Sequence, residues 1–127
     1  MLGDYDVIAF TQTAQPEKAK AFYRDILGLK LVEDSPFALV FWAGSTMLRI
    51  QKVPELTPLP FNVLGWNVPD IRATLANLSS KGVKFERYDG MPQDDAGIWV
   101  TPSGAGVCWF KDPDGNTLSL TQFPRSA

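Results

Sequence analysis

The sequence contains no histidine and only one cysteine, Cys108. Without imidazole, the chain lacks the side chain that most often serves as a near-neutral acid or base and as a metal ligand. A single cysteine excludes a disulfide within the chain and any paired-cysteine metal or redox motif. We expect Cys108 to be a small buried residue rather than a nucleophile, because no histidine is present to activate it.

Long apolar runs and an excess of one charge are also missing. No hydrophobic stretch approaches the ~20 residues that span a bilayer, and the acidic N-terminus lacks the basic start of a signal peptide. The 12 basic and 14 acidic residues are spread along the chain and give a net charge of −2, which leaves no basic surface typical of nucleic-acid binding. We therefore expect a cytoplasmic protein whose partners are neither membranes nor nucleic acids.

The chain has enough apolar residues, 45% of 127, for a single domain over residues 1–127 with a buried core. The predicted helices begin at Pro16 and at the N-cap Asp70, and they end at Gly28 and, after Lys81, at Gly82. Alternating apolar and polar residues predict strands at residues 5–12, 29–33, 37–42, 46–53, 61–68, 83–87, 106–111 and 117–122.

The two halves of the chain repeat one order of elements, a strand, a helix and three strands. Gly28-Leu29-Lys30-Leu31 corresponds to Gly82-Val83-Lys84-Phe85 in the second half. Module one spans residues 1–53 and module two residues 61–127. Residues 54–60 contain three prolines, which exclude a central strand and indicate a linker.

Module two contains an insertion at residues 88–105, rich in glycine, proline and aspartate. Trp99 lies in this insertion and is a candidate for a short extra strand. Long loops in compact domains are often lids or binding loops, and a solvated crossing is the equal alternative here.

The sequences AFYRDILGL at residues 21–29 and FKDPDGN at residues 110–116 resemble the two signatures of the vicinal oxygen chelate superfamily. This superfamily includes glyoxalase I, extradiol dioxygenases and bleomycin-resistance proteins. The resemblance covers nearly the whole chain. It implies an α+β fold of two tandem βαβββ modules that form curled mixed sheets around a cavity, and it implies a homodimer.

Enzymes of that superfamily hold a divalent metal with His, Glu or Gln side chains on four strands. By position, the resemblance places these ligands at Ile8, Arg49, Val63 and Ser119. Two aliphatic groups, a cation and a hydroxyl cannot hold a divalent ion, which needs several carboxylate, imidazole or amide donors. We therefore expect the family's metal site to be missing, and we expect no cofactor.

The strand alternation separates an apolar face from a mixed face in each module. Leu48, Ile50, Leu118 and Leu120 are expected to pack on the helices. The opposite faces, together with Trp99 and Trp109, give the candidate binding residues: Phe10, Gln12, Met47, Arg49, Gln51, Asn67, Trp99, Trp109, Ser119 and Thr121. Trp109 and Trp42 can stack on a planar ligand, or equally lie in the core or in a dimer contact, and Trp99 can act as a lid. A polar face in water would show the same alternation, and the family resemblance favours the cavity.

Arg49 stands out among these candidates. It can hold a carboxylate or phosphate with two hydrogen bonds, or it can be a surface residue paired with Asp6, Asp94 or Asp95. Trp66 is expected in the core from its strand position.

Three functions fit the sequence. The leading hypothesis is a small-molecule-binding protein of the glyoxalase/bleomycin-resistance group that lacks the metal site. This hypothesis favours a binding protein over an enzyme. The second is a glyoxalase- or dioxygenase-like lyase or oxidoreductase with a non-standard site, whose catalytic residues the sequence does not identify; Asp6, Glu33, Glu86 and Tyr88 are loose acid–base candidates. The third is a regulatory or interaction domain with a vestigial cavity.

Overall fold

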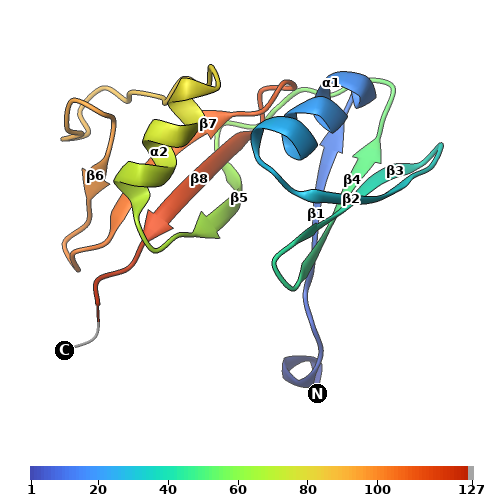
Figure 1. Cartoon of the computed structure of the whole chain (residues 1–127), viewed down its shortest axis with the longest axis horizontal. Helices are drawn as coiled ribbons and strands as arrows, with labels where there is room; N and C mark the ends of the chain where they lie inside the picture. The colour runs from blue at the N-terminus through green and yellow to red at the C-terminus, as the bar shows by residue number, and fades with distance from the viewer. Residues whose placement is uncertain (126–127) are drawn as a thin grey trace. The chain divides into compact units, whose positions relative to one another are not determined.

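The computed structural model describes residues 1–125 and divides into two compact units (Figure 1). Unit 1 spans Met1–Pro58 and unit 2 begins at Leu59. Each unit contains one α-helix and one four-stranded mixed sheet that is curled but not closed. The predicted α+β class and the repeated βαβββ order are therefore confirmed. Within residues 1–125, no helix is long and apolar enough to span a membrane.

Unit 1 follows the predicted order of elements closely. After a short 3₁₀ turn, η1 (Leu2–Asp4), its elements are β1 (Ile8–Thr13), α1 (Pro16–Ala21), the π-helical turn η2 (Phe22–Ile26), β2 (Lys30–Asp34), β3 (Ala38–Ala43) and β4 (Thr46–Lys52). The sheet order is β1-β4-β3-β2, with β1 parallel to β4 and the other pairs antiparallel. The first strand begins later than predicted, because residues 5–7 do not pair with β4.

The helical segment of unit 1 positions its core. Pro16 occupies the start of α1, and Gly28 ends the segment with a φ of 77°, which glycine adopts without strain. Tyr23 on η2 is fully buried, and its ring centroid lies 5.4 Å from that of Phe22 and 5.9 Å from that of Phe41. The aromatic pair of the first signature therefore belongs to the core of unit 1.

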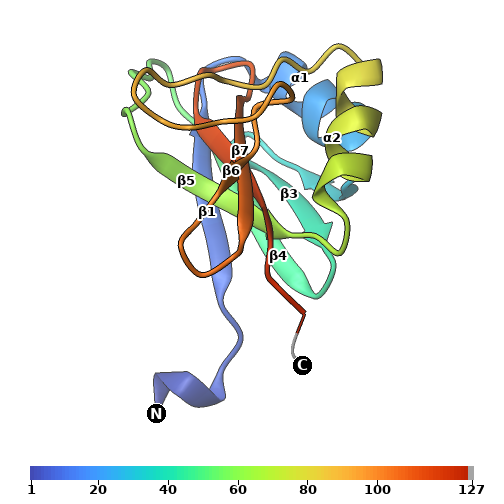
Figure 2. The same cartoon turned by 90° about the vertical axis from the view of Figure 1, so that its left-hand side faces the viewer.

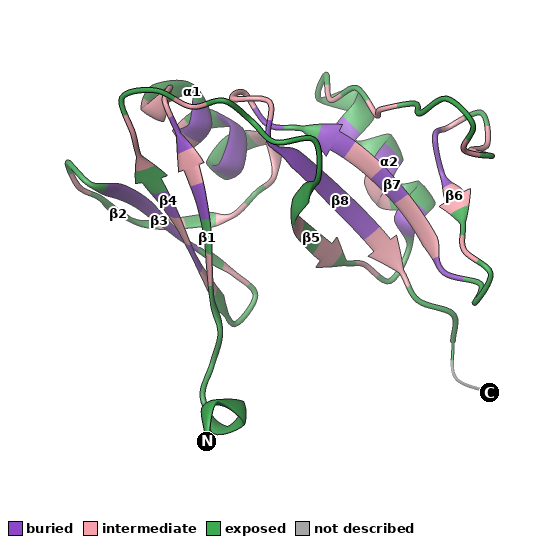
Figure 3. Cartoon of the chain, turned by 180° about the vertical axis from the view of Figure 1, so that it is seen from behind, coloured by how far each residue is buried: buried purple, intermediate pink, exposed green. Residues whose placement is uncertain are grey.

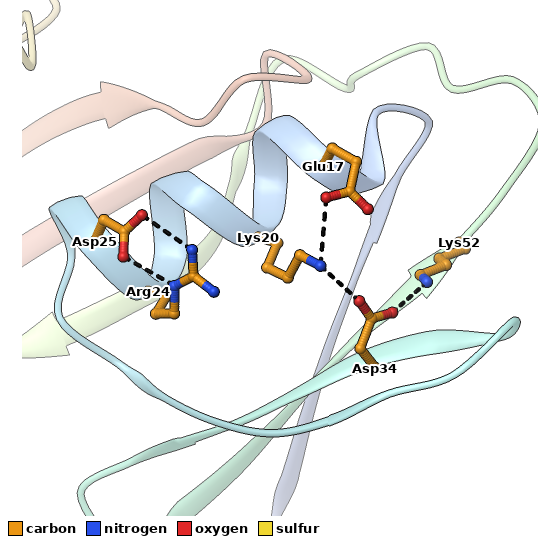
Figure 4. A network of polar contacts seen from close by, with 6 residues as sticks. All are labelled: Glu17, Lys20, Arg24, Asp25, Asp34 and Lys52. Carbon is orange, nitrogen blue, oxygen red and sulfur yellow. Dashed lines mark hydrogen bonds and ion pairs between the residues drawn. The ribbon is translucent and has the colours of Figure 1, made fainter.

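One carboxylate connects three elements of unit 1 (Figure 4). Asp34 at the end of β2 accepts hydrogen bonds from Lys20 Nζ on α1 (2.8 Å) and from Lys52 Nζ on β4 (2.5 Å). Lys20 Nζ also lies 3.3 Å from a carboxylate oxygen of Glu17. The two ammonium groups hold the pKa of Asp34 below its usual value, and the hydrogen bond to Asp34 is the main cause that raises the pKa of Lys20.

Unit 2 contains β5 (Asn62–Asn67), α2 (Ile71–Ser80), β6 (Trp99–Val100), β7 (Gly106–Lys111) and β8 (Thr117–Gln122). The sheet order is β5-β8-β7-β6, with β5 parallel to β8. The Asp70 side chain caps α2 by accepting a hydrogen bond from the Ala73 N–H at 3.1 Å, as predicted. Residues 54–60, before β5, contain no helix or strand.

The strand predicted at residues 83–87 is wrong. Only Phe85 bridges β7, opposite Phe110, and the Glu86 N–H donates to the Trp109 carbonyl at 2.7 Å. The other end of the same β7 edge pairs with β6, where Trp99 lies opposite Val107. In unit 2, the segment around Phe85 and strand β6 therefore share the outer edge of β7. In unit 1, β2 alone occupies the corresponding edge of β3. Trp99 lies on a short strand, as expected.

Helix α2 lies against one face of the second sheet (Figures 1 and 2). A Cβ on Gly106 of β7 would lie 3.6 Å from Ile71 on the helix. On this face Cys108, Phe110, Leu118 and Leu120 are buried, and β8 is buried along most of its length (Figure 3). Trp66 stacks on Phe110 with centroids 6.5 Å apart, which places it on this core side. The alternation predicted for β8, with Leu118 and Leu120 on the core side, is therefore correct.

Candidate functional site

The face of the second sheet that points away from α2 carries rows of facing side chains. Residues directly opposite one another on paired strands share a face. One row runs from Trp109 on β7 to Ser119 on β8 and Gly65 on β5. The neighbouring rows consist of Lys111, Thr117 and Asn62 on one side, and of Trp99, Val107, Thr121 and Asn67 on the other.

Three aromatic side chains meet on this face, and we call them the aromatic platform: Tyr88, Trp99 and Trp109. Trp99 stacks on Trp109 with centroids 6.3 Å apart and planes at 25°, and Tyr88 meets Trp109 edge-on at 5.5 Å. All three remain partly exposed. Desolvation by burial, and secondarily the charge of Glu86, raise the pKa of Tyr88, so its hydroxyl stays protonated near neutral pH.

A cavity of about 300 Å³ lies beside the platform, which is the lower end of the range for small-molecule sites. Its apolar walls are Pro60, Phe61, Met91, Tyr88 and Trp109, and its polar groups come from Asn62, Lys111 and Thr117. A second hollow of about 290 Å³ lies between Trp99 and residues 88–92. Tyr88 and Met91 line both spaces, so the loop that carries them shapes the site.

Polar contacts hold this loop in place. Gln93 accepts from the Tyr88 N–H at 2.7 Å and donates to the carbonyls of Glu86 and Gly97 at 3.0 and 2.8 Å. The Arg87 guanidinium donates to the Asp94 carbonyl at 2.7 Å. The segment that begins at Tyr88 is therefore ordered by its own side chains, and not only by burial.

Asp94 is a second anchor of the same loop. One of its carboxylate oxygens accepts from the N–H groups of Ile98 and Ala96, and the other pairs with Arg72 on α2 at 2.6 Å. The hydrogen bond from Ile98, together with Arg72, holds the pKa of Asp94 below its usual value. Asp94 thus has a structural role in the loop.

The candidate residues of unit 1 lie together on the face of the first sheet opposite α1. Arg49 lies opposite Phe10 on β1, and its Nη1 is 4.0 Å from the sulfur of Met47. Gln12 donates to Gln51 at 3.4 Å. Arg49 is half-buried, and within residues 1–125 none of the ion pairs includes it. This face is polar near Gln12 and apolar near Phe10.

The five candidates of unit 2 also share one face, but their surroundings differ. Trp109 lines the 300 Å³ cavity and Trp99 the second hollow, whereas Ser119 is buried beneath, at 5% exposure. Thr121 and Asn67 lie in the row beyond Trp109 and line neither space.

Several lining residues were not among the predicted binding residues. Lys111 has the same strand parity as Trp109, so alternation alone could have identified it. Predicting that Asn62 lines the cavity requires the register between β5 and β8, and this register shifts around Val63. Tyr88 is predicted only as an acid–base candidate, and Met91 lies in a loop without periodicity. Phe61 is the predicted first residue of a strand that begins at Asn62 in the structure.

The positions carried over from the family's metal site do not fit a divalent ion. Ile8 is exposed, Val63 lies at the register irregularity of β5, Ser119 offers one buried hydroxyl and Arg49 is a cation. Within residues 1–125, no group of three or more His, Cys, Asp or Glu side chains is close enough to hold a metal. Burial raises the pKa of the Cys108 thiol to about 12, which keeps it protonated and unsuited to ligation or attack.

The loose acid–base candidates do not gather in the cavity. Asp6 and Glu33 are exposed on unit 1, and Glu86 precedes Tyr88 without lining either space.

Comparison with known proteins gives a family match and a set of similar folds. The family model described as Glyoxalase/Bleomycin resistance protein/Dioxygenase superfamily matches residues 7–120. Among curated proteins, none matches the chain significantly.

Three solved structures illustrate the likeness of fold. The bleomycin resistance determinant encoded on transposon Tn5 is 23% identical, with a TM-score of 0.75 over 95% of this chain and 99% of the other. TnmS3, an antibiotic binding protein from Streptomyces sp. CB03234, is 24% identical, with a TM-score of 0.70 over 94% and 96%. Lactoylglutathione lyase from Agrobacterium tumefaciens is 19% identical, with a TM-score of 0.69 over 93% and 94%.

Proposed function

Because the chain belongs to the Glyoxalase/Bleomycin resistance protein/Dioxygenase superfamily, we propose that it binds a small planar molecule without the family's metal. The observation that carries this proposal is the aromatic platform beside the 300 Å³ cavity. Trp109 is at its centre, because it contacts both other rings and lines the cavity.

The platform is suited to a flat ligand for two reasons. Large aromatic side chains bury much apolar area, and ring pairs add about 0.5–1.5 kcal/mol beyond that area. Trp99 holds the ring of Trp109 from one side and Tyr88 from its edge, so little side-chain freedom remains to be lost on binding.

Binding without a metal follows from the donors at the carried-over positions. The side chains of Ile8, Val63 and Arg49 supply no lone pair for a divalent ion, and the hydroxyl of Ser119 is a weak ligand alone. The names of two structural neighbours, a bleomycin resistance determinant and an antibiotic binding protein, are compatible with a binding role. The proposed role of the protein is therefore to sequester a planar compound.

We also propose that the protein is a cytoplasmic homodimer. Exposed apolar side chains at Leu2, Tyr5, Val7 and Phe10 supply surface that a second copy would cover. A lone thiol such as Cys108 is compatible with a reducing compartment.

Calorimetric titration with 2-naphthamide, a neutral bicyclic probe, tests the binding function. We expect saturable binding to the wild type and about tenfold weaker binding to Trp109→Leu, because the central ring of the platform is lost. Trp42→Leu is the matched control, since Trp42 is partly exposed on β3 in unit 1 and belongs to no part of the platform. No binding at millimolar probe, or equal weakening by both variants, would contradict the proposal.

A further inference from the structure

The polar end of the 300 Å³ cavity carries a single charged side chain, and its charge is positive. Lys111 lies opposite Thr117, and Thr117 lies opposite Asn62, so three polar side chains form one row on the cavity side of the sheet. All three line the cavity, and none of the lining residues is acidic. The cavity therefore combines an apolar aromatic wall with a cationic end.

The hydrogen bonds within this row leave donors for a ligand. Lys111 Nζ donates to Thr117 Oγ1 at 2.9 Å, which uses one of the three protons of the ammonium group. Thr117 is only 4% exposed, and because its oxygen accepts from Lys111, its own hydrogen can be donated elsewhere. The amide of Asn62 adds an N–H₂ donor. The row is rich in donors where an oxyanion would need them.

Lys111 also differs from the lysines of unit 1 that are paired with carboxylates. Lys20 and Lys52 both bind Asp34, whereas none of the ion pairs within residues 1–125 includes Lys111. An ammonium group held by a buried hydroxyl and facing an apolar wall is positioned to pair with a charge that the chain does not provide.

We propose that this cavity selects planar ligands that carry an oxyanion, a carboxylate or a phosphate, with the flat body on the aromatic platform and the oxyanion at Lys111 and Thr117. The proposal rests on the proposed planar-ligand function and adds the chemical class of the ligand. Trp109 and Lys111 are two residues apart on one face of β7, which separates their Cα atoms by about 6.6 Å. One bicyclic acid can therefore contact both side chains.

A matched series of naphthalene probes tests this selectivity by calorimetry: 2-naphthoate, 2-naphthyl phosphate, neutral 2-naphthamide and cationic 2-naphthylmethylamine. We expect at least one anion to bind about tenfold or more tightly than the amide, because hydrogen bonds to charged groups exceed neutral ones, and we expect the amine to bind weakest. Comparing 2-naphthoate with 2-naphthyl phosphate shows whether the cavity prefers a carboxylate or a phosphate.

Variants assign the selectivity to Lys111. Lys111→Met should remove the advantage of the anion, measured as the ratio of the dissociation constants of 2-naphthamide and the anion, and Lys111→Arg should retain much of it. Thr117→Val should reduce the advantage without changing the net charge. Lys84→Met is the control, because Lys84 is exposed and outside the cavity lining.

The outcomes separate this inference from the function it rests on. If 2-naphthamide binds through Trp109 but the anions bind no better, or if Lys84→Met lowers anion affinity as much as Lys111→Met, the oxyanion selectivity is wrong and the planar-ligand function stands. If no probe binds the wild type, both are wrong. Retained binding of 2-naphthamide by Lys111→Met shows that the variant is folded.

Discussion

Gly65 controls how closely β5 approaches the buried hydroxyl of β8. A Cβ at this position would lie 2.6 Å from Ser119 Oγ and 3.5 Å from the Ser119 carbonyl oxygen, so the serine side chain would have to move. Ser119 is buried and has little room to do so. Because Gly65 has no side chain, β5 can lie close to β8 in the row formed by Trp109, Ser119 and Gly65.

We therefore expect Gly65→Ala to lower the free energy of unfolding by about 1 kcal/mol, the lower range of overpacking in a filled site. Urea unfolding followed by tryptophan fluorescence measures the change. Gly3→Ala is the control, because a Cβ there meets nothing within 4 Å. A Gly65→Ala protein as stable as the wild type would show that Ser119 adjusts freely.

At the same scale, alternation explains why some residues were predicted and others were missed. Leu48 and Ile50 are buried while Met47 and Gln51 lie on the other face, as the period of two requires. Asn62 depends on the register between strands that are far apart in sequence, and that register shifts at Val63. The amino-acid sequence shows which residues of a strand share a face. It does not show which residue of the neighbouring strand lies opposite each of them.

At the scale of elements, the loop that begins at Tyr88 determines the shape of the site. Gln93 bonds to three backbone groups, and one of them is the N–H of Tyr88. Gln93→Ala should therefore loosen Tyr88 and weaken 2-naphthamide binding, since the platform would have to be ordered at the moment of binding.

Calorimetry gives the loss of affinity, and amide hydrogen exchange at residues 88–98 gives the loosening. Asp95→Ala is the matched control, because the exposed Asp95 contributes only its backbone carbonyl to the contacts of the loop. Unchanged affinity together with unchanged exchange in Gln93→Ala would show that the rest of the loop suffices to hold Tyr88.

The carboxylate of Asp34 predicts how the stability of unit 1 depends on pH. Its folded-state pKa is lowered by hydrogen bonds from Lys20 and Lys52. A group of this kind stabilises the fold above its unfolded pKa, and the contribution is lost as pH falls through the folded pKa, between about pH 5 and pH 2. Asp34→Asn should therefore lose less stability than the wild type on acidification over that window.

Urea unfolding at a series of pH values measures this difference. Asp4→Asn serves as the control, since Asp4 is exposed on η1 and belongs to none of the ion pairs within residues 1–125. Equal pH dependence in Asp34→Asn and the wild type would mean that solvent screens the pair fully.

Helix ends could be predicted from residues that are close in sequence, whereas one strand could not. Pro16 and Gly28 predicted the two ends of the helical segment in unit 1. Asp70 and Gly82 predicted the two ends of α2, because capping depends on neighbours in sequence. The strand at residues 83–87 failed for a non-local reason. Within residues 83–87 only Phe85 bridges β7, and the same edge of β7 pairs with β6 at Gly106 and Val107.

At the scale of the whole molecule, the apolar side chains before and along β1 predict association. We expect sedimentation equilibrium to give a homodimer at micromolar concentration, and Val7→Ser with Tyr5→Ser to shift it toward monomer, because both side chains are exposed and apolar. Val100→Ser, an exposed position on the edge strand of unit 2, is the control. A wild-type monomer under these conditions would contradict the dimer.

The most direct test of metal-free ligand binding is a calorimetric titration with 2-naphthamide before and after removal of divalent ions by a chelator. The predicted result is the same dissociation constant in both states, together with a much weaker one for Trp109→Leu in both. Binding that disappears on chelation and returns with one equivalent of Zn²⁺, Ni²⁺, Mn²⁺ or Fe²⁺ would contradict the proposed function.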